Sequence, residues 1–340
     1  MTKPSVIVVG GGICGLLAAT VLQRQGLTVT VLDKGRGIGG RLASRRLRHG
    51  NGVGCFDFGT QYFKAQAPKF QSWVEEWIAA EVVTVWSEGM PTASGTERSQ
   101  GVKLYRGQPS NRSIAQYLAK DLNVINRERA VLVDWRGRQW YVHGESGHCY
   151  QADCLILTPP LPQTLALLET SAIALPEALH HRFQGIHYAP CITLLALLEH
   201  PSQVPYPGGL WLAGEPLAWI ACNTQKGISP DGYGVTIQAG PAFSQTHLET
   251  DPEEVTAFML TAADPWLGSP VLMTYLHRWR YSHPLNFYDD SFVYGEFPGP
   301  IYVGGDAFLL GKVEGAALSG LAIADDLLTK VNVQSGPIFR

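Results

Sequence analysis

The sequence predicts an α/β protein of two domains, one built on a parallel sheet covered by helices and one on an antiparallel sheet. Two observations support this prediction. Near the N-terminus, the β-branched run Val6-Ile7-Val8-Val9 leads into a glycine-rich turn and a helical pattern, as expected of a buried parallel strand. From about residue 161 to 285, the chain changes to long apolar strands interrupted by one helix with an acidic start.

The N-terminal turn has the pattern of a dinucleotide-binding fingerprint, Gly10-Gly11-Gly12-Ile13-Cys14-Gly15. Gly10 permits the tight turn, Gly12 lets a pyrophosphate approach the backbone, and Gly15 lets the helix lie close to the strand. The helix expected over 13–25 directs free N–H groups at the phosphates. A second strand, expected over 28–32, ends at Asp33, 18 residues after Gly15, where an acid can accept hydrogen bonds from ribose hydroxyls.

A second glycine-rich turn follows this acid directly. It runs from Lys34 to Gly39-Gly40-Arg41 and carries Arg36 as well. Backbone N–H groups in such a turn, together with a guanidinium, form a second site for the same pyrophosphate. This turn favours FAD over a nicotinamide cofactor alone.

The C-terminal part has the features expected of the flavin end of the cofactor. A strand over 301–303 ends at Gly304-Gly305-Asp306, where Asp306 is placed to bind ribityl hydroxyls. A final helix then opens with Glu314, Gly315 and Ala316 and runs to about Leu328. Its small residues allow a close approach to a flat ring, and its dipole would stabilise an anionic reduced flavin.

Apolar periodicity predicts the remaining elements. Helices are expected at about 68–80 and 113–122, then a β-meander at 130–133, 139–142 and 149–151, and a return strand at 155–158. The antiparallel sheet is expected from strands at 188–198, 210–213, 235–239 and 271–280, with a helix over 251–263. The polar stretches 92–100 and 226–234 are expected to be mobile loops.

Composition excludes several classes of partner. Hydrophobic residues make up 45% of the 340 residues, charged residues make up 16%, and the formal net charge is −3. No basic face suits a nucleic-acid backbone, and no segment reaches the roughly 18 apolar residues of a membrane span. The six cysteines have neither CxxC nor zinc spacing, so no metal is expected. We expect a cytoplasmic protein that binds neither nucleic acid nor membrane.

These motifs resemble the flavin-containing amine oxidase superfamily, and within it the renalase-like branch. The resemblance rests on Asp33-Lys34 with Gly39-Gly40-Arg41, on 56–63, and on Gly304-Gly305-Asp306 with 313–320, and it extends over nearly the whole chain. It implies a two-domain FAD-dependent oxidoreductase of the amine-oxidase and PHBH-like type. The FAD-binding domain would comprise 1–65, 104–160 and 286–340, and the substrate domain would comprise 66–103 and 161–285. Further cofactor contacts implied by the resemblance are Thr60, Gln61, Tyr62, Ala130 and Thr158.

The resemblance also indicates the kind of substrate. Amine-oxidising relatives commonly carry an aromatic residue two positions before the Glu-Gly-Ala turn, where this chain has Lys312. A lysine repels an ammonium substrate and suits an anionic one. The renalase branch also has a basic residue there. Its implied activity is oxidation of the 1,2- and 1,6-dihydro isomers of NAD(P) to NAD(P)+, with O2 reduced to H2O2.

By the same resemblance, a substrate pocket is expected around three aromatic residues. Tyr62, Trp219 and Trp279 would form flat walls for a nicotinamide ring, with Asn223 and Arg280 as polar contacts. Ordinary core packing is the alternative for each aromatic residue. Gln238 stands where renalase relatives carry a histidine. Because no cysteine follows Cys222, the FAD is expected to be bound non-covalently.

Three functions therefore stay open from the sequence. The first is a renalase-like oxidase of dihydronicotinamide dinucleotides. The second is a flavin-dependent oxidase or dehydrogenase of an amine or another small molecule. The third is a flavin-binding sensor without turnover of its own.

Overall fold

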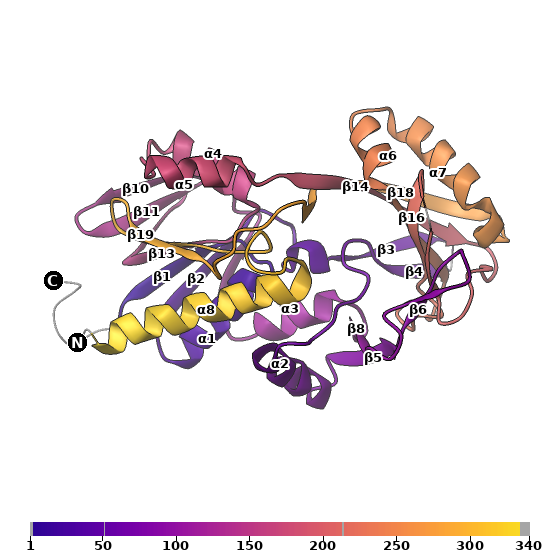
Figure 1. Cartoon of the computed structure of the whole chain (residues 1–340), viewed down its shortest axis with the longest axis horizontal. Helices are drawn as coiled ribbons and strands as arrows, with labels where there is room; N and C mark the ends of the chain where they lie inside the picture. Colours follow the sequence, from indigo (N-terminus) through magenta and orange to yellow (C-terminus); the bar gives the residue numbers. More distant parts are fainter. Residues whose placement is uncertain (1–2, 51, 213, 334–340) are drawn as a thin grey trace.

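In the computed structural model, which describes residues 3–50, 52–212 and 214–333, a mainly parallel sheet forms one half of the molecule (Figure 1). Within the described residues it has six strands in the order β19-β20-β13-β1-β2-β9. Their bounds are β1 Ser5–Val9, β2 Thr28–Asp33, β9 Asn123–Asn126, β13 Cys154–Leu157, β19 Val293–Glu296 and β20 Pro300–Val303. Only the edge pair β19–β20 is antiparallel among these strands. Since both faces are covered, the apolar run of β1 is buried over its last four residues.

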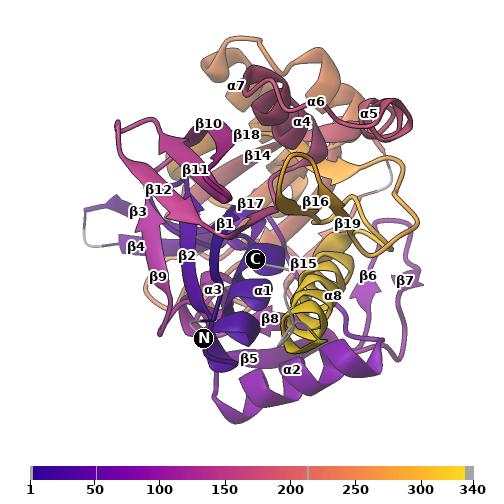
Figure 2. The same ribbon diagram turned by 90° about the vertical axis from the view of Figure 1, so that its left-hand side faces the viewer.

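Helices cover one face of this sheet. The core there is formed by α1 Ile13–Arg24, α2 Pro68–Ala79, α3 Arg112–Leu118 and the C-terminal helix α8 Lys312–Val333. A short 3₁₀ turn, η1 Gly40–Leu42, adds Leu42 to the same core. The two long helices α1 and α8 lie side by side (Figure 2).

The opposite face carries a small antiparallel sheet and two helices. The small sheet consists of β10 Ala130–Arg136, β11 Gln139–Gly144 and β12 Cys149–Ala152, and the helices are α4 Leu161–Thr170 and α5 Glu177–Gln184. Their side chains share a second core with Ile7, Leu155 and Leu157 of the parallel sheet. The predicted parallel sheet covered by helices is thereby confirmed, and the small antiparallel sheet adds to the cover on this face.

The other half of the molecule is an antiparallel sheet. As far as the chain is described, its strand order is β15-β16-β17-β14-β18. The strands are β14 Tyr188–Leu198, β15 Gly209–Trp211, β16 Leu217–Cys222, β17 Tyr233–Ala239 and β18 Val271–Pro284. One face packs on α6 Pro241–Thr246 and α7 Pro252–Leu267. Asp251 caps α7 by accepting the N–H of Glu253 at 2.8 Å, and Pro252 opens the helix.

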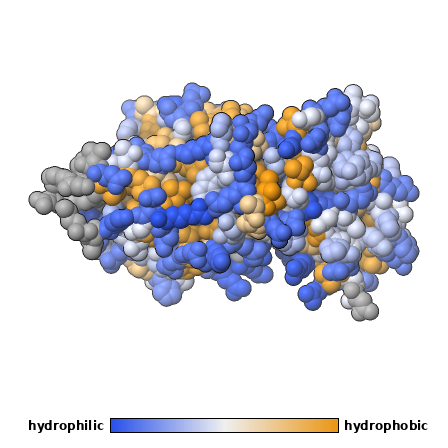
Figure 3. All heavy atoms as spheres, turned by 90° about the horizontal axis from the view of Figure 1, so that it is seen from below, coloured by the Kyte–Doolittle hydropathy of each residue, from blue (hydrophilic) through white to orange (hydrophobic). Residues whose placement is uncertain are grey.

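Segments from the first third of the chain cover the other face of this antiparallel sheet. The ribbon of β3 Ser44–His49 and β4 Gly52–Asp57 crosses from the first half and buries Leu47 and Phe56 against Leu195 and Leu197 (Figure 1). Beside it lie two small ribbons, which pair β5 Val83–Ser87 with β8 Leu104–Gly107 and β6 Met90–Pro91 with β7 Glu97–Arg98. Seen from below, the surface narrows between the two halves, and hydrophobic residues are exposed there (Figure 3).

Several predicted bounds differ from the structure. The helix expected over 113–122 ends at Leu118. The N–H groups of Lys120 and Leu122 donate to carbonyls three residues back, which does not continue the α-helix, and β9 begins at Asn123. The strand expected to end at 280 continues to Pro284. Residues 1–2, 51, 213 and 334–340 lie outside the described residues. Of these, residue 213 falls in the expected strand 210–213, and 334–340 fall in the expected domain range 286–340.

Two segments are placed differently from the sequence expectation. The stretch 226–234 is not a wholly solvent-exposed loop, because Lys226 and Ser229 at its start are buried. Helix α2 lies within the range 66–103 expected for the substrate domain, yet Phe70, Val74 and Trp77 pack in the core of α1 and α8. The division into domains stays a prediction. Among the described residues, no helix combines the length and the apolar character needed to cross a membrane.

The contact between α1 and α8 yields a stability prediction. A Cβ at Gly320 would lie 2.2 Å from the backbone oxygen of Cys14, and no side-chain rotation can relieve a clash with backbone. Gly320→Ala should lower the free energy of unfolding by about 2 kcal/mol or more, measured by urea denaturation. Gly185→Ala is the control, because a Cβ there meets its nearest atoms at 3.5 Å. Equal stability of the two variants would contradict the prediction.

Candidate functional site

The fingerprint turn has the geometry that its glycines require. Gly10 has a φ of 110°, and a Cβ on it would lie 2.5 Å from Oγ1 of Thr158. A Cβ on Gly15 would lie 2.1 Å from the carbonyl oxygen of Gly10. A Cβ on Gly12, by contrast, would meet no described atom within 4 Å. The helix N-terminus formed by Ile13 and Cys14 therefore lies beside open space on the Gly12 side.

Asp33 ties the two glycine-rich turns together. One carboxylate oxygen accepts the N–H of Gly11 at 2.7 Å, and the other accepts the N–H of Gly35 at 2.7 Å. The carbonyl of Asp33 accepts the N–H of Glu128 at 2.9 Å, which brings the start of β10 at Ala130 close to this turn. Lys34 donates to Oε1 of Gln163 on α4 at 2.9 Å.

Arg41 and Asp306 join the second turn to the C-terminal part of the chain. The guanidinium and the carboxylate form a two-point ion pair, with Nη2 to Oδ1 at 2.7 Å, and Asp306 is 6% exposed. Tyr188 on β14 also donates to Asp306, at 3.2 Å. Burial raises the pKa of Tyr188, so its hydroxyl stays protonated and able to donate. The carbonyl of Arg41 accepts the N–H of Thr60 at 2.8 Å.

The turn before α8 is held in an unusual backbone conformation. Leu309, Gly311 and Lys312 all have positive φ, of 58°, 64° and 57°, which is uncommon for residues that carry a side chain. Lys312 is exposed at the first position of the helix. Glu314 accepts the N–H groups of Gln66 and Ala67, both at 2.6 Å, and so joins this turn to the chain before α2.

The helix start itself is closely packed. The hydroxyl of Ser319 accepts the N–H of Gly305 at 3.0 Å, and Gly315 donates to the carbonyl of Gly311 at 2.9 Å. Ala316 is buried. The two turns that the sequence assigned to one cofactor are thus brought together, because a Cβ at Gly304 would lie 3.6 Å from Sγ of Cys14.

Four aromatic rings form a cluster, here called the aromatic box: Tyr62, Trp86, Trp211 and Trp219. Tyr62 and Trp219 are 5.8 Å apart between ring centroids, and Trp211 lies 5.1 Å from Trp219. Trp86 meets Tyr62 at 6.2 Å and Trp219 at 6.1 Å in edge contacts. Sequence reasoning found two of the four. It missed Trp211, which pairs directly opposite Trp219, and Trp86 on β5.

Trp279 lies on the same face of the antiparallel sheet but outside the box. It stacks on Phe58 at 5.2 Å and contacts His277 at 4.3 Å. Its indole N–H donates to the carbonyl of Phe58 at 3.0 Å.

Arg280 is not brought to this face. Successive residues of a strand point to opposite faces, and Arg280 forms an ion pair with Glu249 on the far side. Side chains alternate between the two faces along a strand, so the sequence alone could have placed Arg280 on the face opposite to Trp279. Asn223 is fully buried and donates to the hydroxyl of Thr236 at 2.9 Å. It therefore lies behind the box rather than on an open surface.

The residues 57–62 connect the box to the cofactor turns. Gln61 donates its amide to the carbonyl of Asp57 at 2.8 Å, while its Oε1 is buried without a partner among the described residues. Nε1 of Trp219 is likewise buried and unpartnered there. Buried polar groups normally have partners, so both atoms leave hydrogen-bonding capacity for a bound molecule. Together with the open side of Gly12, these residues fit a flavin dinucleotide. Among the described residues, no cluster of His, Cys, Asp or Glu could hold a metal ion.

Two family models match the chain over nearly all of it. Residues 8–77 match the NAD(P)-binding Rossmann-like domain. Residues 93–328 match the flavin containing amine oxidoreductase family. The two matches leave residues 78–92 between them, a stretch that contains β5.

Individual proteins also resemble the chain. Renalase of Mus musculus is 26% identical over 341 residues, which cover 94% of this chain and 97% of that protein. Carotenoid phi-ring synthase of Streptomyces griseus is 52% identical over 40 residues, which cover 12% of this chain and 8% of that protein.

Solved structures show the same fold. A putative protoporphyrinogen oxidase from Exiguobacterium sp. 255-15 superposes with a TM-score of 0.72 at 13% identity, over 97% of this chain and 100% of that one. Putrescine oxidase bound to putrescine gives 0.70 at 15% identity, over 97% and 99% of the two chains. Since the amine oxidoreductase model matches well over half of the sequence, the chain belongs to the flavin-containing amine oxidoreductase family, as a renalase-like flavin-dependent oxidoreductase.

Proposed function

We propose that the chain is a renalase-like oxidase that converts the 1,2- and 1,6-dihydro isomers of NAD(P) to NAD(P)+. The observation that carries this proposal is Lys312, exposed at the start of α8 where amine-oxidising relatives commonly place an aromatic residue. Burial lowers the pKa of His283, the charge of Asp306 opposes this shift, and the charges of Lys312 and Arg41 lower the pKa further. Because Arg41 is paired with Asp306, the proposal relies on Lys312 as the cation that suits a substrate carrying phosphates.

We propose non-covalent FAD as the cofactor. Gly10, Gly12 and Gly15 with Gly40, Arg41 and Asp306 would hold its pyrophosphate and ribityl chain. Bound flavin supplies hydride acceptance from the donor carbon and electron transfer to O2, giving H2O2. All six cysteines are free, and burial raises the pKa of Cys14, which lies nearest the cofactor turns, to about 12. This thiol therefore stays protonated and unreactive near neutral pH.

The box residues would position the substrate ring rather than exchange protons with it. Burial raises the pKa of Tyr62, and its hydroxyl accepts the indole N–H of Trp211 at 3.2 Å. Outside the box, burial lowers the pKa of His277, which lies against Trp279, to about 4, so this imidazole is neutral at pH 7. A hydride donor needs no general base, whereas a protonated amine must first lose its proton. These groups therefore favour the dihydronicotinamide substrate.

An amine or another small molecule is the second candidate substrate. The observation in its favour is the aromatic box, because aromatic faces also attract cations. Lys312 opposes it.

Acid precipitation tests the cofactor proposal. Intact FAD should appear in the supernatant, identified by its mass and absorbance. Flavin that stays with the precipitate would show a covalent link and contradict the proposal. FMN in the supernatant would contradict the role given to the fingerprint turn.

Anaerobic reduction tests the substrate proposal. The flavin absorbance band should bleach rapidly with 1,2- or 1,6-dihydro-NAD(P) but slowly with ordinary 1,4-NAD(P)H and with a panel of amines. Readmitted air should restore the colour and form peroxide. Bleaching by amines alone would establish the second candidate. No bleaching by any compound would favour a flavin-binding sensor.

The charge of Lys312 can be tested separately. Lys312→Met should lower kcat/KM for the dihydro-NAD(P) isomers about fivefold at low salt, since one exposed charge contributes about 1 kcal/mol at most. The effect should shrink at 0.5 M salt because of screening. The control is Lys330→Met, about 27 Å further along the same helix by its rise per residue. A salt-independent loss, or an equal loss in the control, would contradict the electrostatic role.

A further inference from the structure

The backbone of residues 57–60 is held by side chains from both halves of the molecule. Each of the four successive carbonyls accepts a side-chain hydrogen bond. The donors are Thr236 Oγ1 to Asp57 at 3.0 Å, Trp279 Nε1 to Phe58 at 3.0 Å, Gln238 Nε2 to Gly59 at 2.8 Å and Asn111 Nδ2 to Thr60 at 2.6 Å. The path of this segment, and with it the place of Tyr62, therefore depends on β17 and β18 as well as on the first half.

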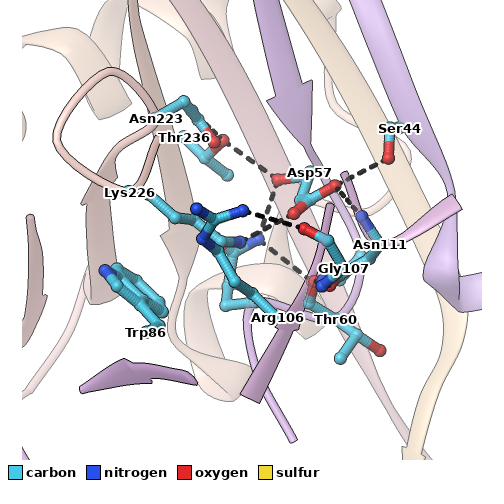
Figure 4. A network of polar contacts seen from close by, with 12 residues as sticks. Ser44, Asp57, Thr60, Trp86, Arg106, Gly107, Asn111, Asn223, Lys226 and Thr236 are labelled. Atoms are coloured by element: carbon cyan, nitrogen blue, oxygen red, sulfur yellow. Dashed lines mark hydrogen bonds and ion pairs between the residues drawn. The ribbon is translucent and has the colours of Figure 1, made fainter. Parts of the chain in front are cut away.

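A buried ion pair fixes the start of the same segment (Figure 4). Nζ of Lys226 lies 2.8 Å from Oδ2 of Asp57, and both side chains are fully buried. The other carboxylate oxygen accepts the hydroxyl of Ser44 at 2.6 Å and the N–H of Asn111 at 3.0 Å. Burial lowers the pKa of Lys226 while the charge of Asp57 raises it, and the nearby Arg106 lowers it further.

The pair also lies directly behind the aromatic box. Nζ of Lys226 is 4.9 Å from the ring of Trp86, which it contacts as a cation over an aromatic face. Trp86 is in turn fixed by its own indole N–H, which donates to the carbonyl of Pro207 at 2.9 Å. Two walls of the box, Tyr62 and Trp86, thus depend on the two ends of one ion pair.

Stability alone does not account for this pair. Desolvating two charges costs about as much as their attraction returns, and apolar residues of equal volume are often at least as stabilising. What a buried pair can add is one defined geometry, because either charge without its partner is strongly unfavourable. The geometry defined here is that of the segment leading to Tyr62.

We propose that Lys226 and Asp57 are positioning residues for the flavin-dependent reaction: their ion pair sets the path of residues 57–62 and so the placement of Tyr62 in the box. Neither residue needs to touch the substrate. The kinetic part of this proposal rests on the proposed function, whereas the structural part does not depend on any substrate.

The experiment uses the flavin-loaded protein and the double variant Lys226→Met with Asp57→Asn. Both new side chains are uncharged and close in size to the originals, and the asparagine oxygen can still accept from Ser44 and Asn111. The double variant should melt close to wild type, because no unpaired charge remains. Amide hydrogen exchange of 57–62 should nevertheless be at least tenfold faster, since its anchor is lost. For the donor that bleaches the flavin fastest, kcat should fall at least tenfold and KM less than threefold.

The single variants and a core variant serve as controls. Lys226→Met and Asp57→Asn alone should lower the melting temperature more than the double variant does, because each leaves a buried charge or donor unpaired. Met259→Ala, a change on the buried side of α7, should destabilise the protein without faster exchange in 57–62. Wild-type exchange and kcat in the double variant would overturn the proposal, as would equally fast exchange in Met259→Ala. Faster exchange in a protein that no donor reduces would uphold the positioning role and refute the proposed function.

Discussion

The backbone contact between the first and last helices is the constraint on which the rest of the molecule depends. At Gly15, α1 touches the turn that precedes it, and at Gly320, α8 touches the backbone of Cys14. Protein interiors are packed too tightly to accept extra atoms at such points. Because these helices meet, the turns at 10–15 and 304–315 lie together although nearly the whole chain separates them. One cofactor can therefore be held by both ends of the sequence.

The second half is joined to this frame through the chain after β4. The ribbon β3–β4 crosses to the antiparallel sheet, and the residues that follow carry hydrogen bonds to β17, β18 and the start of α3. The same residues end at Tyr62, one wall of the aromatic box. Tyr62 and the second glycine-rich turn, 34–41, are thus parts of one continuous stretch of chain, so the path of that stretch determines where the box lies relative to the turn.

The sequence allowed prediction of whatever depends on local pattern. The fingerprint turn, the ends of β14 at Tyr188 and Leu198, and the acidic start of α7 at about residue 251 followed from periodicity and spacing. The pairing of distant strands did not follow, so Trp86 and Trp211 were missed. Lysines are almost never fully buried unless they are paired, and the partner of Lys226, Asp57, is 169 positions away in the sequence. The local sequence therefore indicated a solvated loop residue at Lys226.

The buried pair restricts how this sequence can diverge. Loss of either charge alone leaves the other stranded in the interior, so a protein lineage cannot easily replace Lys226 and Asp57 one after the other. Related chains are expected to keep both residues, exchange them for another complementary pair, or lose both. A surface pair such as Arg24 and Glu76, at 2.7 Å but partly exposed, is under no such restriction. Exposed pairs can therefore change one residue at a time, whereas substitutions of Lys226 and Asp57 behind the box are coupled to each other.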